Sequence, residues 1–459
     1  MSKKLKLIVA LTLCVVMIAS LFAGCGKKTN SGTDGTGTDS TTTNQGDTKA
    51  EKTKITFWFY PRYVVEGKEN GVYEQELIDA YVKENPNVDI EFEMLAWNQG
   101  PEKINIAISS NAMPDSVFDY PGRIIGYGAQ GVLADLNFMF TEEDRKDIPQ
   151  SILDHCMLGD KIYMYPTHIS PVIMGVNRKL FRDAGVEDLL PLDDPNNPDR
   201  LWTIDQFQKA LEGIRDNLKN VAPIVFYAGN EQGDASIRMF IQNFGADFVN
   251  KEHDKVVINS EAGVKGLQWI LDAYKNGLIA KGAESLTSTD ALDMFTQGAA
   301  ATCILFGPGN MNTLNKAIAE GKAAEGFDFA FVPQPSIDGK SVKVEAQVIG
   351  YCIFDNKDQK RIEESAKFIE YLAKDPKNVL ASGAFPVRAS MGQLYDHPEL
   401  SYAGNISRYV ADTGYTINNY AKVRALWYPE LQAALTGAKT AKQALDDFAA
   451  RATEVINEK

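Results

Sequence analysis

Apolar residues follow two periods along residues 55–459, and the two periods alternate. The run ITFWFY (55–60) and the alternating stretch DIEFEML (89–95) each predict a β-strand, since side chains in a strand point to opposite faces in turn. Between them, GVYEQELIDAYVKENPN (71–87) repeats its apolar positions with helical spacing and ends beside a proline. Further strands are expected at SVFDY, VIMGVN, APIVFY, TCILFG, DFAFVPQ and QVIGYCIF.

The predicted helices between these strands begin at recognisable caps. Thr203 with Gln206, and Thr440 with Gln443, have the spacing of a capping box. Ser260 precedes a third helical pattern. Regular alternation of strands and helices predicts an α/β fold with largely parallel sheets.

The first 54 residues have a different pattern. Three lysines precede the apolar run LIVALTLCVVMIASLFAG, which is typical of a secretory signal peptide over residues 1–24. The seam LFAGC resembles the bacterial lipoprotein cleavage box, which implies that Cys25 receives lipid and anchors the chain to the membrane. Residues 25–54 carry almost no apolar side chains after this cysteine and are expected to form a disordered tether. An uncleaved membrane anchor is the alternative.

Charge and cysteine content narrow the function classes. Without the lysines of residues 1–24, 44 basic residues face 61 acidic ones, a formal charge of −17 that argues against nucleic acid as a partner. The remaining cysteines, Cys156, Cys303 and Cys352, form neither a CxxC pair nor a zinc spacing. They stand in apolar segments and predict buried free thiols, with no metal site and no cofactor.

Catalytic motifs are absent from the sequence. It contains no HExxH, no GxSxG and no phosphate-binding loop. Two of its many acidic residues could still form the carboxylate pair that glycoside hydrolysis needs, and this alternative stays open. Instead, aromatic and polar residues recur together after predicted strands, where ligands bind in open α/β sheets. These residues are Trp58, Tyr60 and Arg62; Asp119, Tyr120 and Arg123; Tyr227, Glu231 and Asp234; Phe306 and Asn310; and, in ALWYPE, Trp427 and Tyr428. Sugars suit such a mixture, because their CH faces pack on rings and their hydroxyls need polar partners.

An ordered set of segments resembles the extracellular solute-binding proteins of ATP-driven sugar importers, the family that includes maltodextrin-binding proteins. The segments include KITFWF, ENPNVDIEFE, KINIAISSNAMPDSVFDY, GAQGVLADLN, MGVNRKLFRDAGV, ALDMFTQGAAATCILFGPGN and ALWYPELQAALTGAKTAKQALDDF. The resemblance implies a periplasmic-binding-protein-like α/β fold, with two lobes joined by a hinge and the ligand in the cleft between them. It places lobe 1 at 55–165 plus 347–385 and lobe 2 at 166–346 plus 386–459.

The same resemblance implies a lipid-anchored monomer on the extracellular face of the bacterial membrane, which captures an oligosaccharide for the permease of an ABC transporter and is not an enzyme. It adds His168 at a lobe crossing, and Trp97 or Phe306 as a substitute for a family tryptophan that Gly309 replaces. Two alternatives remain open. One is a tethered glycosidase or lyase. The other is the same fold with a non-sugar solute such as a polyamine, which Glu345 would favour by adding an acid to the predicted cleft. The complete predicted ligand set is Trp58, Tyr60, Arg62, Trp97, Asp119, Arg123, His168, Tyr227, Glu231, Asp234, Phe306, Asn310, Glu345, Trp427 and Tyr428.

Overall fold

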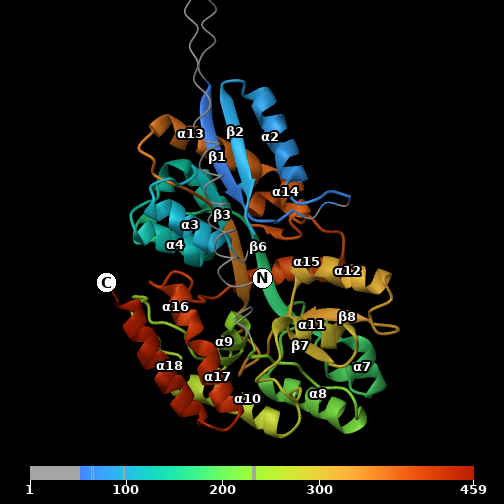
Figure 1. Ribbon diagram of the computed structural model, residues 1–459. Coiled ribbons are helices and arrows are strands. Elements are labelled where there is room, and N and C mark those ends of the chain that lie inside the picture. The colour runs from blue at the N-terminus through green and yellow to red at the C-terminus, as the bar shows by residue number, and fades with distance from the viewer. Residues whose placement is uncertain (1–51, 64, 66, 97–98, 230–233, 459) are drawn as a thin grey trace, which may run out of the picture. The chain divides into compact units, whose positions relative to one another are not determined.

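The computed structural model describes residues 52–458 except 64, 66, 97–98 and 230–233 (Figure 1). The predicted signal peptide, Cys25 and nearly all of the predicted tether lie outside the described residues. The strands are β1 (Thr53–Phe59), β2 (Val88–Met94), β3 (Ser116–Asp119), β4 (Met157–Leu158), β5 (Lys161–Ile162), β6 (Tyr165–Asn177), β7 (Thr302–Phe306), β8 (Phe329–Val332), β9 (Glu345–Ile353) and β10 (Phe385–Pro386).

The helices lie between these strands and after the last of them, with runs of consecutive helices between β6 and β7 and after β10. They are α2 (Val72–Glu84), α3 (Gly100–Ser109), α4 (Pro121–Ala129), α5 (Glu142–Asp147), α6 (Gln150–Leu153), α7 (Arg178–Asp183), α8 (Ile204–Asn217), α9 (Asp234–Gln242), α10 (Glu261–Lys275), α11 (Ser288–Thr296), α12 (Met311–Ala319), α13 (Gln359–Lys374), α14 (Pro376–Ala381), α15 (Pro398–Ile406), α16 (Tyr420–Ala425), α17 (Trp427–Leu435) and α18 (Ala441–Ile456). Short 3-10 turns include η3 (Asp154–Cys156) and η5 (Pro308–Asn310). The α/β class is confirmed.

The predicted helix caps form as expected. The hydroxyl oxygen of Thr203 accepts the N–H of Gln206, whose side chain accepts the N–H of Thr203 in return. Thr440 and Gln443 make the same reciprocal pair, and Ser260 accepts the N–H of Gly263 at the start of α10. Each box satisfies backbone donors that the first helical turn leaves without partners.

The main sheet has the strand order β10-β6-β9-β3-β1-β2, with β7 and β8 also paired to β6. β1 runs parallel to β2 and β3. The expectation of largely parallel sheets is wrong, because β3 with β9, and β6 with β7, β8, β9 and β10, all pair antiparallel. The stretch APIVFY forms only isolated parallel bridges, at Ala222, Ile224 and Val225.

The long strand β6 changes partners along its length. Its residues from Tyr165 to Val172 pair with β9, whereas those from Ile173 to Asn177 pair with β7 and β8. We call β1, β2, β3, β9 and the beginning of β6 the first sheet part, and β7, β8 and the end of β6 the second sheet part. One continuous strand therefore carries the chain from one part to the other.

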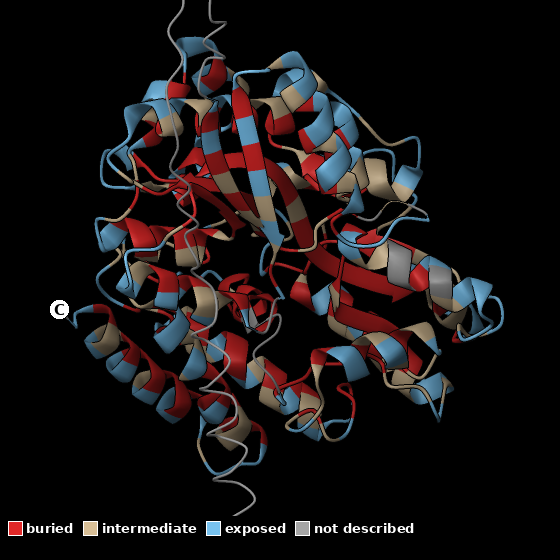
Figure 2. Ribbon diagram, turned by 45° about the horizontal axis from the view of Figure 1, so that its top comes forward, coloured by how far each residue is buried: buried red, intermediate tan, exposed pale blue. Residues whose placement is uncertain are grey.

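The core follows both sheet parts. Figure 2 shows buried residues along the strands and on the inner sides of the helices. The thiols of Cys156, Cys303 and Cys352 are free and fully buried, as predicted, and burial raises the pKa of each. Among the residues that the structure describes, no helix combines the length and apolar character needed to cross a membrane.

Candidate functional site

Three predicted residues meet where β1 and β3 end. The parallel register of β1 and β3 places Trp58 opposite Val117. Tyr60 therefore lies at the same edge of the sheet as Asp119. Arg123, in the first turn of α4, donates from Nε to both carboxylate oxygens of Asp119 at 2.9 and 2.8 Å. Its guanidinium also lies 5.6 Å from the ring centroid of Tyr60. The sequence predicted that Tyr60 and Asp119 follow strand ends, and the parallel pairing of β1 with β3 brings those ends together.

The carboxylate of Asp119 is enclosed. Its side chain is 0% exposed, whereas that of Arg123 is 30% exposed. Burial raises the pKa of Asp119 above its usual value, and the neighbouring Arg123 opposes that rise. The backbone N–H of Tyr120 is a further donor to the carboxylate, at 2.8 Å. The guanidinium is thus the partly exposed member of an otherwise buried pair.

Arg62 lies against the other face of the same strand ends. Its guanidinium carbon is 4.1 Å from the ring centroid of Tyr63, 4.3 Å from that of Phe118 and 4.9 Å from that of Tyr351. The Nε atom has no hydrogen-bond partner among the described residues. Aromatic faces therefore surround this cation, and its Nη2 donates to the hydroxyl of Tyr63.

His168 stands beside Arg62 on the crossing strand β6. Its ring stacks on Phe118 with a centroid distance of 5.9 Å. The hydroxyl of Thr167 lies 2.9 Å from Nδ1 of His168 and 3.1 Å from the carbonyl oxygen of Ile349. Burial, with a smaller effect of Arg62, lowers the pKa of His168 to about 3. The imidazole is therefore neutral near pH 7.

A second group surrounds Glu345, at the beginning of β9. One carboxylate oxygen accepts the hydroxyl of Ser236 at 2.6 Å, and the other accepts that of Tyr415 at 3.2 Å. Glu345 is 2% exposed. The side chain joins α9, β9 and the segment before α16, a role that the sequence did not suggest.

The remaining predicted residues are largely buried in this conformation. Trp427 is 1% exposed and packs edge-on against Phe448 of α18, and Tyr428 and Tyr227 are also buried. Phe306 lies in a phenylalanine cluster, 4.9 Å from the ring centroid of Phe295. Their assignment to a ligand site stays a prediction.

Asn310 and Trp58 have visible partners. The side-chain oxygen of Asn310 accepts the N–H of Gly307 in η5. Trp58 is half-buried, and Nζ of Lys103 lies 4.9 Å from its ring centroid. Trp97, Glu231 and the side chain of Asp234 lie outside the described residues.

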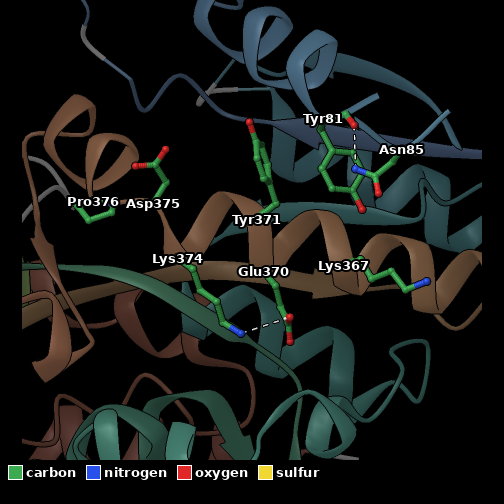
Figure 3. Close-up of a pocket in the computed structure, with 8 residues that line it drawn as sticks. All are labelled: Tyr81, Asn85, Lys367, Glu370, Tyr371, Lys374, Asp375 and Pro376. Carbon is green, nitrogen blue, oxygen red and sulfur yellow. Dashed lines mark hydrogen bonds and ion pairs between the residues drawn. The ribbon is translucent and has the colours of Figure 1, made fainter. Parts of the chain in front are cut away.

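Two depressions on the surface of the described residues include no predicted ligand residue. The first encloses about 620 Å³ between the end of α2 and helices α13 and α14; its lining includes the rings of Tyr81 and Tyr371 and the ion pair of Lys374 with Glu370 (Figure 3). The second encloses about 450 Å³ between residues 255–260 and α18. The first lies near the start of β2, at the sheet edge opposite Tyr60 and Asp119.

The described cluster is better suited to binding than to proton transfer. A general acid or base works best with a pKa near the working pH, whereas His168 is neutral at pH 7 and Asp119 is held by Arg123. No group of three or more His, Cys, Asp or Glu residues in the described part of the chain could hold a metal ion. Aromatic faces and hydrogen-bonding groups remain as the chemistry of the site.

Sequence reasoning missed several residues that hold these groups in place. Tyr351, Ser236 and Tyr415 contact Arg62 or Glu345 from distant parts of the chain. Arg388 also crosses the chain, with Nη2 donating to the hydroxyl of Tyr165 at 2.6 Å. None has a local sequence pattern that distinguishes it.

Comparison with known proteins gives a consistent result. Residues 66–379 match the family described as "Bacterial extracellular solute-binding protein". A galactooligosaccharide-binding protein of Bacillus subtilis is 23% identical over 85% of this chain and 88% of its own. An arabinooligosaccharide-binding protein of the same species is 23% identical over 65% of this chain, and the alignment spans 62% of that relative's length.

Solved structures share the fold. The sugar-binding protein MalE of Xanthomonas citri aligns with a TM-score of 0.72 and 17% identity, covering 88% of this chain and 97% of its own. The cyclic α-maltosyl-1,6-maltose binding protein of Arthrobacter globiformis aligns with a TM-score of 0.70 and 19% identity, covering 88% and 99%. The predicted periplasmic-binding-protein-like fold is thereby confirmed.

Proposed function

Because the chain belongs to the bacterial extracellular solute-binding protein family, we propose that it captures an oligosaccharide between two lobes and delivers it to the permease of an ABC importer. The observation that carries the proposal is the family match over residues 66–379. The names of its relatives, which bind arabino- and galactooligosaccharides, support a sugar as the solute.

The proposed lobes are close to the two sheet parts but do not coincide with them. Lobe 1 contains 55–165 plus 347–385, and lobe 2 contains 166–346 plus 386–459. Support comes from β6, which runs from the first sheet part into the second and changes partners between Val172 and Ile173, a few residues beyond the proposed boundary after 165. β9 begins at Glu345, beside the proposed boundary at 347. The ligand would contact Tyr60, Arg62 and Arg123 from lobe 1. It would contact His168 and the Glu345 and Trp427 regions from lobe 2. Contacts to both lobes are needed, because a ligand shifts an open–closed equilibrium only by binding one state better.

A thermal-shift screen of the purified body tests the sugar proposal. Arabino-, galacto- and maltooligosaccharides of increasing length are added, with the monosaccharides as controls. A true ligand raises the melting temperature by mass action, and the shift grows with sugar concentration. Chromatography of the recovered sugar should show it unchanged; shorter products would favour a glycosidase or lyase. A shift with a polyamine and with no sugar would contradict the carbohydrate assignment.

The membrane attachment is a separate proposal. Cys25, in the sequence LFAGC, would carry the lipid, and the polar residues after it would form the tether. Cys25→Ala should move the protein from the membrane fraction to the soluble fraction. A variant that stays in the membrane fraction would instead favour an uncleaved apolar anchor.

A further inference from the structure

Helix α4 packs against α16 through a glycine. Gly122 is the second residue of α4, and a Cβ built there would lie 2.7 Å from Cδ1 and 3.2 Å from Cε1 of Tyr420, the first residue of α16. The carbonyl oxygen of Tyr415 would be 3.5 Å away. α4 contacts β9 of the first sheet part, whereas α16 contacts α17 and α18. The contact therefore joins the two regions that the proposed function assigns to different lobes.

Tyr420 is held from several sides. It is 7% exposed, and its ring packs edge-on against Tyr415 with a centroid distance of 5.1 Å. Nη2 of Arg238 donates to its hydroxyl at 3.4 Å. Tyr415 in turn donates to Glu345 at the start of β9. The ring that faces Gly122 thus has little space into which it could withdraw.

The need for glycine at position 122 comes from this contact and not from the backbone. Gly122 has helical conformation, and its φ is not in the left-handed region. Alanine would be accepted by the helix itself and favoured over glycine by propensity. Gly126 of the same helix offers a matched comparison, because a Cβ built there meets nothing within 4 Å.

We propose that the contact of Gly122 with Tyr420 sets how far the two lobes close, and that Gly122 is a positioning residue for ligand binding. The inference rests on the proposed function, since it concerns a closing motion around a ligand. A side chain at position 122 must displace the ring of Tyr420 or hold α4 away from α16. The fraction of closed protein then falls, and the apparent affinity falls with it.

Binding measurements test the positioning role. With the sugar that gives the largest thermal shift in the screen, Gly122→Ala should weaken binding by about 5- to 100-fold, the usual effect of one excess methyl group in a tight contact. Gly126→Ala should bind like the natural protein. In a Tyr420→Ala background the ring is gone, so adding Gly122→Ala should weaken binding by less than about threefold. An equal loss in both backgrounds, or no difference between Gly122→Ala and Gly126→Ala, would overturn the inference.

Disulfide trapping tests the contact without relying on affinity. The double variant G122C/Y420C replaces the ring with a thiol and should form a disulfide under mild oxidation, whereas G126C/Y420C should not. The three native thiols of the described body are fully buried, so they do not compete. Addition of a bound sugar should speed the 122–420 disulfide, because closure brings the pair together. A missing disulfide, or a rate that a bound sugar leaves unchanged, contradicts the inference; a natural protein that binds no sugar contradicts the proposed function instead.

Discussion

Removal of the guanidinium of Arg123 should destabilise the protein through the carboxylate that it leaves behind. The perturbation is Arg123→Met, which keeps an apolar side chain and removes the charge. Asp119 is 0% exposed, so its carboxylate cannot turn to water for compensation. What the variant measures is the cost of an unpaired buried charge at the edge of the sheet.

The magnitude follows from the burial of the two partners. Breaking a buried ion pair by removing one partner costs about 3–5 kcal/mol. Two features reduce that cost here: Arg123 is 30% exposed, and the N–H of Tyr120 still donates to Asp119. We therefore expect a loss of about 2–4 kcal/mol in the free energy of unfolding at pH 7.

The loss should shrink as the pH falls. Without Arg123, burial raises the pKa of Asp119 further above its unfolded value of about 3.9. A carboxyl group whose pKa is higher in the folded state than in the unfolded state stabilises the folded state at a pH below the unfolded-state pKa. This stabilisation is lost as the pH rises through the folded-state pKa. The difference between the natural protein and Arg123→Met is therefore largest near neutral pH and smallest near pH 4.

Urea unfolding at pH 7 and pH 4, followed by circular dichroism, measures this difference. Lys54→Met is the control, because Lys54 and Glu91 form an exposed pair with side chains 57% and 59% exposed, and its unfolding midpoint should hardly change. Adding Asp119→Asn to Arg123→Met should recover much of the loss. A loss below about 0.5 kcal/mol at pH 7, or one that is equal at both pH values, would refute the reasoning.

Four further outcomes are expected. The hydrogen bond to Asp412 raises the pKa of His253, so protonated His253 stabilises the folded state below about pH 6.5, and this stabilisation is lost as the pH rises through the raised pKa. His253→Gln should therefore lower the melting temperature more at pH 6 than at pH 8.5. Equal shifts at the two pH values would contradict this. Arg388→Met should lower the free energy of unfolding by about 3 kcal/mol in urea titrations, because the side chains of Arg388 and its partner Asp144 are 7% and 9% exposed; an unchanged midpoint would show that the pair contributes nothing net. Trp427→Ala should lower the free energy of unfolding by about 3–5 kcal/mol, because it leaves a cavity in the core. If Trp427 lies at the ligand site, the same change should also weaken sugar binding by about 1.5–3 kcal/mol, measured by calorimetry below the variant's melting temperature. Unchanged affinity would remove Trp427 from the site. The three buried thiols should react with a thiol reagent only after unfolding, and rapid labelling of the folded body would contradict their burial.

Part of the site could be predicted because the end of an apolar run, where a strand stops, is a local feature of the sequence. Tyr60 and Asp119 follow apolar runs that pair in parallel, so their positions at the ends of β1 and β3 bring them together. Arg123 lies four residues after Asp119, within the first turns of a helix. The capping boxes at Thr203 and Thr440 were equally predictable, since each is complete within four residues.

The partners of Arg62 and Glu345 could not be predicted in this way. Glu345 is bound by Ser236, 109 residues earlier, and by Tyr415, 70 residues later. Tyr351 reaches Arg62 only because β9 returns antiparallel beside β3. No spacing in the sequence encodes such contacts, because they depend on which strand returns beside which.

The sequence by itself determined where most of the strands and helices lie, the caps that start the helices, and the burial of the three thiols. These features depend on a few neighbouring residues or on the apolar character of a short segment. Only the tertiary structure decided the antiparallel course of β6 and β9, and the close approach of Gly122 to Tyr420. The physical reason is that these arrangements minimise the free energy of the whole packed chain, to which distant residues contribute together.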